Sequence, residues 1–276
     1  MKAKFIVNDY ALIWNLLFQA SISESIHKLK KKLWETYKVE YNKAYNDKLN
    51  ILKDIKNFIP DDDTIYNIIL KQKNYDKIKK LAEKYRLDLM KLWDKNKKAT
   101  NELFNNIVRK EIQDYTFFAV NKELNIIDHS FPGSIVIGKK IDSKDQFSIL
   151  YDITKIIIVD NLKKYNEEDK KFMKAIVELA VLNEYATQLN GFSCYLSGDP
   201  ELLSIKRWLY PYWLMYLGIP KNEFISYMMR DKVSFDQDKY AYEKELKKMN
   251  IEEFIDFCIR NKKYIVREQK NKLEVL

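Results

Sequence analysis

Glycine and proline are scarce in this sequence, with five of each among 276 residues. Proteins built from many short strands need both residue types for their turns, so this scarcity argues against an all-β protein and favours long helices. All five glycines lie between residues 133 and 218. This shift in composition predicts a helical N-terminal part, followed by a part that contains more turns.

Long hydrophobic runs are also missing. No stretch approaches the roughly 18 uninterrupted apolar residues that suggest a membrane span, so no membrane partner is expected. Near the N-terminus, an apolar run at 11–18 follows Asn8 and Asp9 and is interrupted by Asn15. No small-residue cleavage site follows the run, so we expect no signal peptide.

Cysteine and histidine occur only twice each. Cys194 and Cys258 lie far apart and form no C-x-x-C motif, which indicates a reducing, cytoplasmic setting and no zinc knuckle. His27 and His129 each stand alone, so neither predicts a metal ligand. The composition therefore points to no cofactor.

Apolar residues make up 46% of the chain and recur with a helical period in its first part. Residues 21–59 are predicted as one helix of more than about 30 residues, because Ser21 and Glu24 have capping-box spacing and Pro60 ends the pattern. Further helices are expected at 63–71 and 75–110, with a break near 95–99. The first helix carries an aromatic band predicted to face the core: Trp34, Tyr37, Tyr41 and Tyr45.

Positive charge is concentrated in one stretch. The chain carries a net charge of +9, and residues 71–99 hold ten lysines and Arg86 against four acids, a net charge of +7. Apolar residues recur there every three to four positions, which predicts a helix with a buried stripe and a solvated lysine face. The stripe comprises Ile78, Leu81, Tyr85, Leu89 and Leu92. The same stretch leaves open a basic nucleic-acid-binding module.

A β-type pattern begins near residue 115. Three short runs, "TFFAV", "LNIID" and "SIVIG", surround a turn signal at 131–133 and predict a small antiparallel or mixed sheet of about three strands. Two helices follow, at 144–164 and 166–191, the first capped by Ser143 and the second by Asn166 and Gly191. Both are apolar on nearly every side, so they are predicted to be central and buried.

Several helices are expected after Gly191. The aromatic-rich stretch 207–218 is predicted to belong to a core helix at 200–217, with a pocket wall as the alternative. Further helices are expected near 221–231, 237–248 and 251–262, and the polar tail 263–276 is expected to fray.

Charged residues stand inside the two central helices. Asp152 and Lys155 lie on the first, and Glu178 and Glu184 on the second. Burying such charges is costly unless they are paired, so they are either a site or ordinary helix-surface charges.

The stretch from about 115 to 195 resembles the zincin metallopeptidases of the gluzincin type. Its "YDITK" at 151–155 occupies the place of His-Glu-x-x-His, and "LNEYATQL" is similar to the segment that carries the third zinc ligand, at Glu184. The resemblance also implies that the strand at 134–142 is a substrate-aligning edge strand.

The ligands that this family needs are absent. Tyr151 and Lys155 replace the two histidines, and Asp152 replaces the general base. A protonated lysine cannot bind zinc, so the resemblance implies a degenerate site with no metal and no metal-dependent chemistry. We hypothesise that the Lys155 ammonium takes the place of the cation and pairs with Glu184 or Asp152.

Together these patterns predict a mostly helical α+β protein. A helical N-terminal region, 1–112, precedes a zincin-like core with C-terminal helices, 113–276. The favoured function is a catalytically inactive, metallopeptidase-like protein that binds a protein or peptide. Two alternatives stay open: a metal-independent enzyme that uses carboxylates between the two central helices for acid–base work, and nucleic-acid binding through 71–99.

Overall fold

The computed structural model describes residues 1–19, 24–129, 131, 133–142, 145–192, 196–230 and 243–266. They form two compact units, each built from two stretches of chain: 1–95 with 113–153, and 96–112 with 154–276. The expected boundary at 112/113 is one of three points where the chain passes between units. The units interleave because the strands after residue 113 pair with a strand near the N-terminus.

The first unit contains a four-stranded mixed sheet in the order β1-β2-β4-β3. Its strands are β1 (Ala3–Ile6), β2 (Tyr115–Ala119), β3 (Ile126–Asp128) and β4 (Ser134–Gly138). The β1/β2 and β2/β4 pairs are parallel, and the β3/β4 pair is antiparallel. The three predicted strands are confirmed. The sequence analysis missed β1, a four-residue strand with no signal of its own, which joins the sheet by pairing with a strand more than a hundred residues away.

The position of β4 differs from the expectation that 134–142 provides an edge strand. β4 is hydrogen-bonded to β2 on one side and to β3 on the other, and all five of its residues are buried. The edge strands of this sheet are β1 and β3. The expected edge position is therefore wrong for the strand at 134–138, because β4 is paired with a strand on each side.

Helices fill the rest of the first unit. They are α1 (Asp9–Phe18), α2 (Glu24–Thr36), α3 (Lys38–Asn46), α4 (Lys48–Lys53), α5 (Ile65–Leu70), α6 (Tyr75–Lys95), the 3₁₀ turn η2 (Lys122–Leu124) and the first residues of α8 (Ser148–Asp160). The single helix predicted over 21–59 is wrong: the chain breaks at Tyr37, whose φ of −130° and ψ of 49° are not helical, and again at Asp47. Asn46 and Asp47 are weak helix formers, because their side chains compete for backbone hydrogen bonds.

These breaks also divide the aromatic band. Trp34 and Tyr45 are 42% and 53% exposed, whereas Tyr37 and Tyr41 are half-buried against the core of α1 and α5. The Tyr41 hydroxyl donates a hydrogen bond to the carbonyl of Leu17 at 2.7 Å. The prediction of a continuous core stripe is therefore wrong, because a change of helix axis changes which positions share a face.

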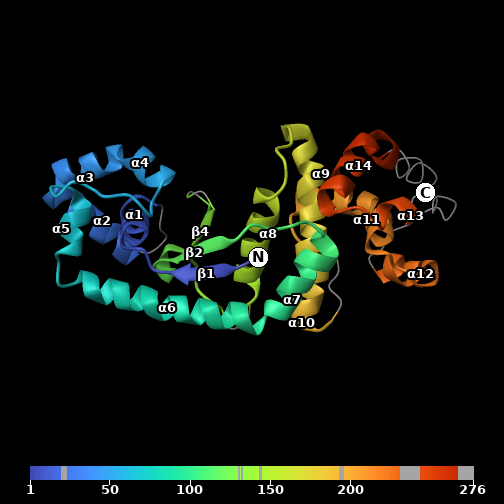
Figure 1. The fold of residues 1–276 in the computed structure, drawn as a ribbon, viewed down its shortest axis with the longest axis horizontal. Coiled ribbons are helices and arrows are strands. Elements are labelled where there is room, and N and C mark those ends of the chain that lie inside the picture. Colours follow the sequence, from blue (N-terminus) through green and yellow to red (C-terminus); the bar gives the residue numbers. More distant parts are fainter. Residues whose placement is uncertain are drawn as a thin grey trace. The chain divides into compact units, whose positions relative to one another are not determined.

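Helix α6 lies along β1 and β2 (Figure 1). Trp93 packs edge-on against Phe5 of β1, with ring centroids 6.0 Å apart. The predicted stripe holds at Tyr85, Leu89 and Leu92, which are buried, but Leu81 is 65% exposed. The small residue Ala82 occupies the buried position instead, one residue further round the helix.

The second unit is helical. It contains α7 (Lys97–Glu102), the π-helix η1 (Leu103–Val108), the remainder of α8, α9 (Glu167–Glu178), the π-helix η3 (Leu179–Tyr185), α10 (Ala186–Asn190), the 3₁₀ turn η4 (Pro200–Leu202), α11 (Leu203–Leu217), α12 (Lys221–Arg230), α13 (Glu243–Leu246) and α14 (Ile251–Arg260). The predicted break near 95–99 is confirmed at Asn96. The predicted core helix is confirmed as α11, which packs on α9 with its aromatic residues buried.

The second central helix runs without a gap through α9, η3 and α10 (Figure 1). Asn166 caps it by accepting a hydrogen bond from the Asp169 N–H, and Gly191 ends it with a φ of 72°, so its predicted bounds are confirmed. The π-helical segment in its middle has no counterpart in the sequence prediction.

The described residues confirm a mostly helical α+β protein. None of the helices in these ranges combines the length and the hydropathy needed to cross a membrane. Some predicted features lie outside the described residues: the capping residues Ser21 and Ser143, Cys194, part of the helix near 237–248 and most of the tail.

Candidate functional site

Helix α8 carries the stretch 151–155, for which the sequence resemblance was noted. Apolar residues at helical spacing form its buried stripe: Ile149, Leu150, Ile153, Ile157 and Ile158. Tyr151, Asp152 and Lys155 lie beside this stripe and are half-buried. Residue 153 is the last of the first unit, so Tyr151 and Asp152 belong to the first unit, and Lys155 to the second.

In the first unit, Asp152 forms an ion pair with Lys139, which directly follows β4. The Lys139 Nζ lies 2.7 Å from the Asp152 Oδ2. The backbone at Lys139 is held in turn by Tyr85 of α6, whose hydroxyl bonds to the Lys139 carbonyl. Asp152 therefore connects α8 to the end of the sheet through a lysine.

In the second unit, Lys155 pairs with a carboxylate of the second central helix. Its Nζ lies 3.6 Å from the Glu178 Oε1. Glu178 also pairs with Lys206 of α11 at 2.7 Å, and Lys206 donates to the carbonyl of Ser197 at 2.5 Å. The backbone N–H of Asp199 completes the group by donating to Glu178 at 3.1 Å. These five residues are the Glu178 cluster.

The Glu178 cluster is largely withdrawn from solvent. The side chain of Lys206 has no exposed surface, that of Glu178 is 11% exposed and that of Lys155 is 29% exposed. A buried ammonium is tolerated only when a carboxylate and further acceptors replace its hydration, and Lys206 has both. Two ammonium groups face the Glu178 carboxylate, and the Asp199 carboxylate accepts the Glu201 N–H, so the positive and negative charges of the cluster balance. Lys155 is the more exposed of the two ammonium groups.

The expected partner of Lys155 needs correction. Its ion pair goes to Glu178 and not to Glu184 or Asp152; Glu184 accepts a hydrogen bond from the indole N–H of Trp213 at 3.0 Å. Glu178 and Glu184 are six residues apart, which is not a whole number of helical turns, so they point to different sides of their helix. The ammonium-to-carboxylate pairing between the two central helices is present, with a different carboxylate.

The donor set does not suit a metal ion. Within the described residues, no group of three histidine, cysteine, aspartate or glutamate side chains is placed to hold one. In the Glu178 cluster, ammonium groups stand where further anionic or neutral ligands would be needed. The residues present therefore do not fit the zinc site of the resembled family.

Lys206 was not singled out by the sequence prediction, although a signal for it exists. It falls three to four residues before Leu209 and Tyr210, on the buried face of an aromatic helix. A charged residue on a buried face requires a partner, and Glu178 was the unexplained acid in the neighbouring apolar helix. Pairing Lys206 with Glu178 at the sequence level would therefore have predicted the central ion pair of the cluster.

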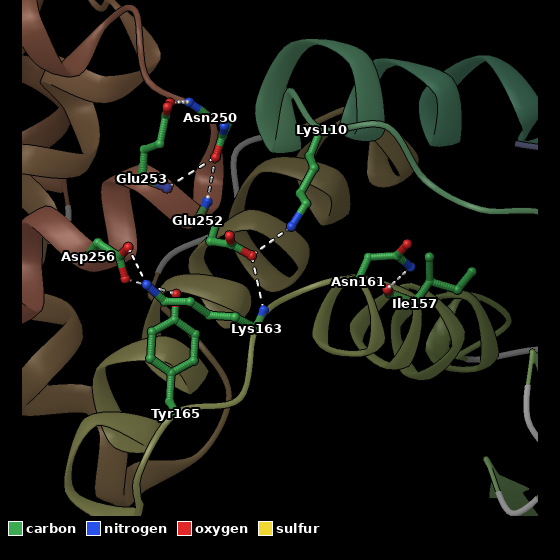
Figure 2. Close-up of polar contacts among 9 residues, drawn as sticks. All are labelled: Lys110, Ile157, Asn161, Lys163, Tyr165, Asn250, Glu252, Glu253 and Asp256. Atoms are coloured by element: carbon green, nitrogen blue, oxygen red, sulfur yellow. Dashed lines mark hydrogen bonds and ion pairs between the residues drawn. The ribbon is translucent and has the colours of Figure 1, made fainter.

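A concave region lies elsewhere on the second unit. It is a cleft of about 990 Å³, lined by the stretch 163–169 and by residues of α13 and α14. Figure 2 shows the polar network beside it: the Lys110 Nζ lies 2.6 Å from Glu252, and the Lys163 N–H donates to the same carboxylate at 3.0 Å. Lys163 also pairs with Asp256, to which the Tyr165 hydroxyl donates at 3.3 Å.

This network changes the proton affinities of its members. Burial alone would raise the pKa of Glu252, but the hydrogen bonds from Lys110 and the Lys163 backbone, with both lysine charges, hold it below its usual value. Burial, then the charge of Asp256, raises the pKa of Tyr165. At neutral pH the network beside the cleft therefore holds a charged Glu252, and Tyr165, which lines the cleft, is neutral.

The basic stretch 71–99 corresponds mainly to α6 of the first unit. Lys77, Lys80 and Lys84 are exposed along it, as a solvated lysine face predicts.

Comparison with protein-family models, curated proteins and solved structures found no match to this chain. What the molecule does must therefore be inferred from side-chain chemistry.

Proposed function

We propose that this chain is a catalytically inactive, metallopeptidase-like protein that acts by binding a protein or peptide. The observation that carries the proposal is the pair Lys155–Glu178. It puts an ammonium at the second ligand position of the degenerate motif and holds it with a carboxylate of the second central helix. The positive charge that a metal would bring is thus supplied by a side chain.

The chemistry of the motif supports a role without catalysis. A protonated amine has no lone pair for zinc, and a phenol at Tyr151 is a poor replacement for imidazole. Asp152, at the position of the general base, is paired with Lys139. Asp152 is therefore engaged in an ion pair and Glu184 accepts a hydrogen bond from Trp213, which favours binding over the metal-independent enzyme.

We also propose a cytoplasmic setting. The chain has two cysteines, and the one that the structure describes, Cys258, is a free and buried thiol. Burial raises the pKa of this thiol well above its usual value, so it stays protonated and unreactive. Inert, unpaired thiols are typical of proteins from reducing compartments.

Metal analysis of purified protein tests the proposal. We expect far less than one zinc per chain and no peptidase activity. Restoring the motif on α8 with Tyr151→His, Asp152→Glu and Lys155→His should raise the zinc content towards about one per chain, because two imidazoles one helical turn apart suit Zn²⁺.

The matched control places alanine at the two ligand positions: Tyr151→Ala, Asp152→Glu and Lys155→Ala. It disrupts the same contacts but offers no imidazole, so its zinc content should stay at the level of the natural chain. Stoichiometric zinc or zinc-dependent peptidase activity in the natural chain would contradict the inactive role. Equal zinc in the restored and control variants would contradict the zincin resemblance.

A further inference from the structure

The cleft of the second unit is lined by charged side chains of both signs, but they are not equally available. Its carboxylates are largely engaged within the protein. Asp256 is held by Lys163 and Tyr165, and Asp169 is held by Lys262 at 3.2 Å. Glu253 accepts the Asn250 N–H at 2.9 Å in the capping box of α14.

Three of the four lysines that line the cleft are different. Lys164, Lys244 and Lys248 line it and are exposed, and none of them takes part in an ion pair within the residues that the structure describes. Arg260 adds a fourth cation, whose Nε donates to the Asp256 carbonyl. Glu245 offsets one of these charges. The available charge in the cleft is therefore positive.

A concave surface whose available charges are mostly positive attracts ligands that carry negative charge. The volume of about 990 Å³ can hold several residues of an extended peptide. Tyr165, Met249 and Ile259 add apolar lining between the charges. Such a surface suits discrete negative charges that alternate with apolar side chains.

We propose that this cleft binds an acidic peptide segment of a partner protein, through Lys164, Lys244 and Lys248. This inference deepens the proposed binding function and rests on it. A nucleic acid fits less well, because its continuous phosphate backbone would also face the carboxylates of Glu245 and Glu253. A peptide can place apolar residues at those points.

The test is fluorescence anisotropy with the full chain and a labelled peptide of glutamates interspersed with leucines. The cleft variant carries Lys164→Glu, Lys244→Glu and Lys248→Glu. A matched variant carries Lys77→Glu, Lys80→Glu and Lys84→Glu on the exposed face of α6, so both lose the same net charge. All six positions are exposed, so circular dichroism should show unchanged folding.

We expect the cleft variant to bind the peptide at least about tenfold more weakly and the α6 variant less than about threefold, because local charge complementarity outweighs net charge. Binding should weaken with salt, and a peptide with glutamine in place of glutamate should bind poorly. Equal loss in both variants would overturn the proposal, as would tighter binding of a labelled single-stranded oligonucleotide through the cleft lysines.

The two proposals can fail separately. If the natural chain contains stoichiometric zinc and cleaves peptides, the inactive role fails, while the anisotropy comparison of the two lysine variants still reports on the cleft. If the cleft variant binds the peptide as well as the natural chain does, the cleft assignment fails and the metal analysis is unaffected.

Discussion

Position 198 requires glycine for two separate reasons. Its φ of +114° lies in a region that residues with a side chain rarely adopt, and an added Cβ would lie 2.3 Å from the Glu178 Oε2. Glu178 cannot easily withdraw, because Lys206 and the Asp199 N–H hold it. The glycine therefore allows the 197–199 turn to close over the Glu178 cluster.

We predict that Gly198→Ala lowers the free energy of unfolding by about 2–4 kcal/mol, the sum of backbone strain and displacement of a buried ion pair. Gly191→Ala is the matched control: its φ is +72°, but nothing lies within 4 Å of the added Cβ. The control substitution should lower the free energy of unfolding by only about 1–2 kcal/mol. Urea unfolding measures the stability of both variants. An equal loss of stability in the two would show that the clash with Glu178 is unimportant.

Lys155 illustrates what a single residue does and does not reveal. Its position in an apolar helix predicts a buried or half-buried charge with a partner on the second central helix, and the structure provides one. The choice of Glu178 over Glu184 depends on the rotation of that helix around its axis. The rotation follows from how α9 packs on α11, which the local pattern does not specify.

Among the elements, α6 shows how far periodicity reaches. An apolar period of 3.6 residues predicts the helix and most of its buried face. It does not decide which of the adjacent residues 81 and 82 is buried. The larger Leu81 is exposed and the smaller Ala82 is buried. The space left in the core of the first unit decides the outcome, since a close approach between packed elements favours the smaller side chain.

This contrast gives a prediction with an internal control. Leu89→Ala should lower the free energy of unfolding by about 2–5 kcal/mol, because Leu89 is 2% exposed and leaves a cavity. Leu81→Ala makes the same chemical change in the same helix and should change the free energy of unfolding by about 0.5 kcal/mol or less. Chemical denaturation compares the two. A large loss for Leu81→Ala would mean that its exposed side chain is covered in solution.

At the scale of the whole molecule, the two compact units do not follow the chain in order. The stretch 96–112 enters the second unit before the sheet of the first is complete. Glu252 then joins parts of the second unit that are distant in sequence, by contacting both Lys110 and the Lys163 backbone (Figure 2). A charged Glu252 therefore helps to hold these parts of the unit together.

We predict that acid destabilises the protein partly through Glu252. Its pKa in the folded state is below the usual value of 4.5, so the unfolded chain takes up the proton first as the pH falls. The stabilisation is complete above about pH 4.5 and is lost as the pH falls through the lower, folded-state pKa. Glu252→Gln should be less stable than the natural chain at pH 7, with the difference shrinking in acid.

Thermal unfolding between about pH 3 and pH 7 measures this dependence. Glu245→Gln, a change to an exposed carboxylate of the cleft, is the control and should leave the acid dependence of the natural chain in place. A difference between Glu252→Gln and the natural chain that stays constant with pH would show that Glu252 acts by packing and not through its charge.

The sequence alone determined the local features: a mostly helical chain, three of the four strands, the bounds of the second central helix and the unusual charges at Asp152, Lys155 and Glu178. Each depends on periodicity, capping or turn chemistry among near neighbours. Only the tertiary structure decided the interleaved units, the interior place of β4, the break at Tyr37 and the pairing of Lys155 and Lys206 with Glu178. These depend on contacts between residues far apart in the chain, and such contacts are set by how whole elements pack and turn against one another.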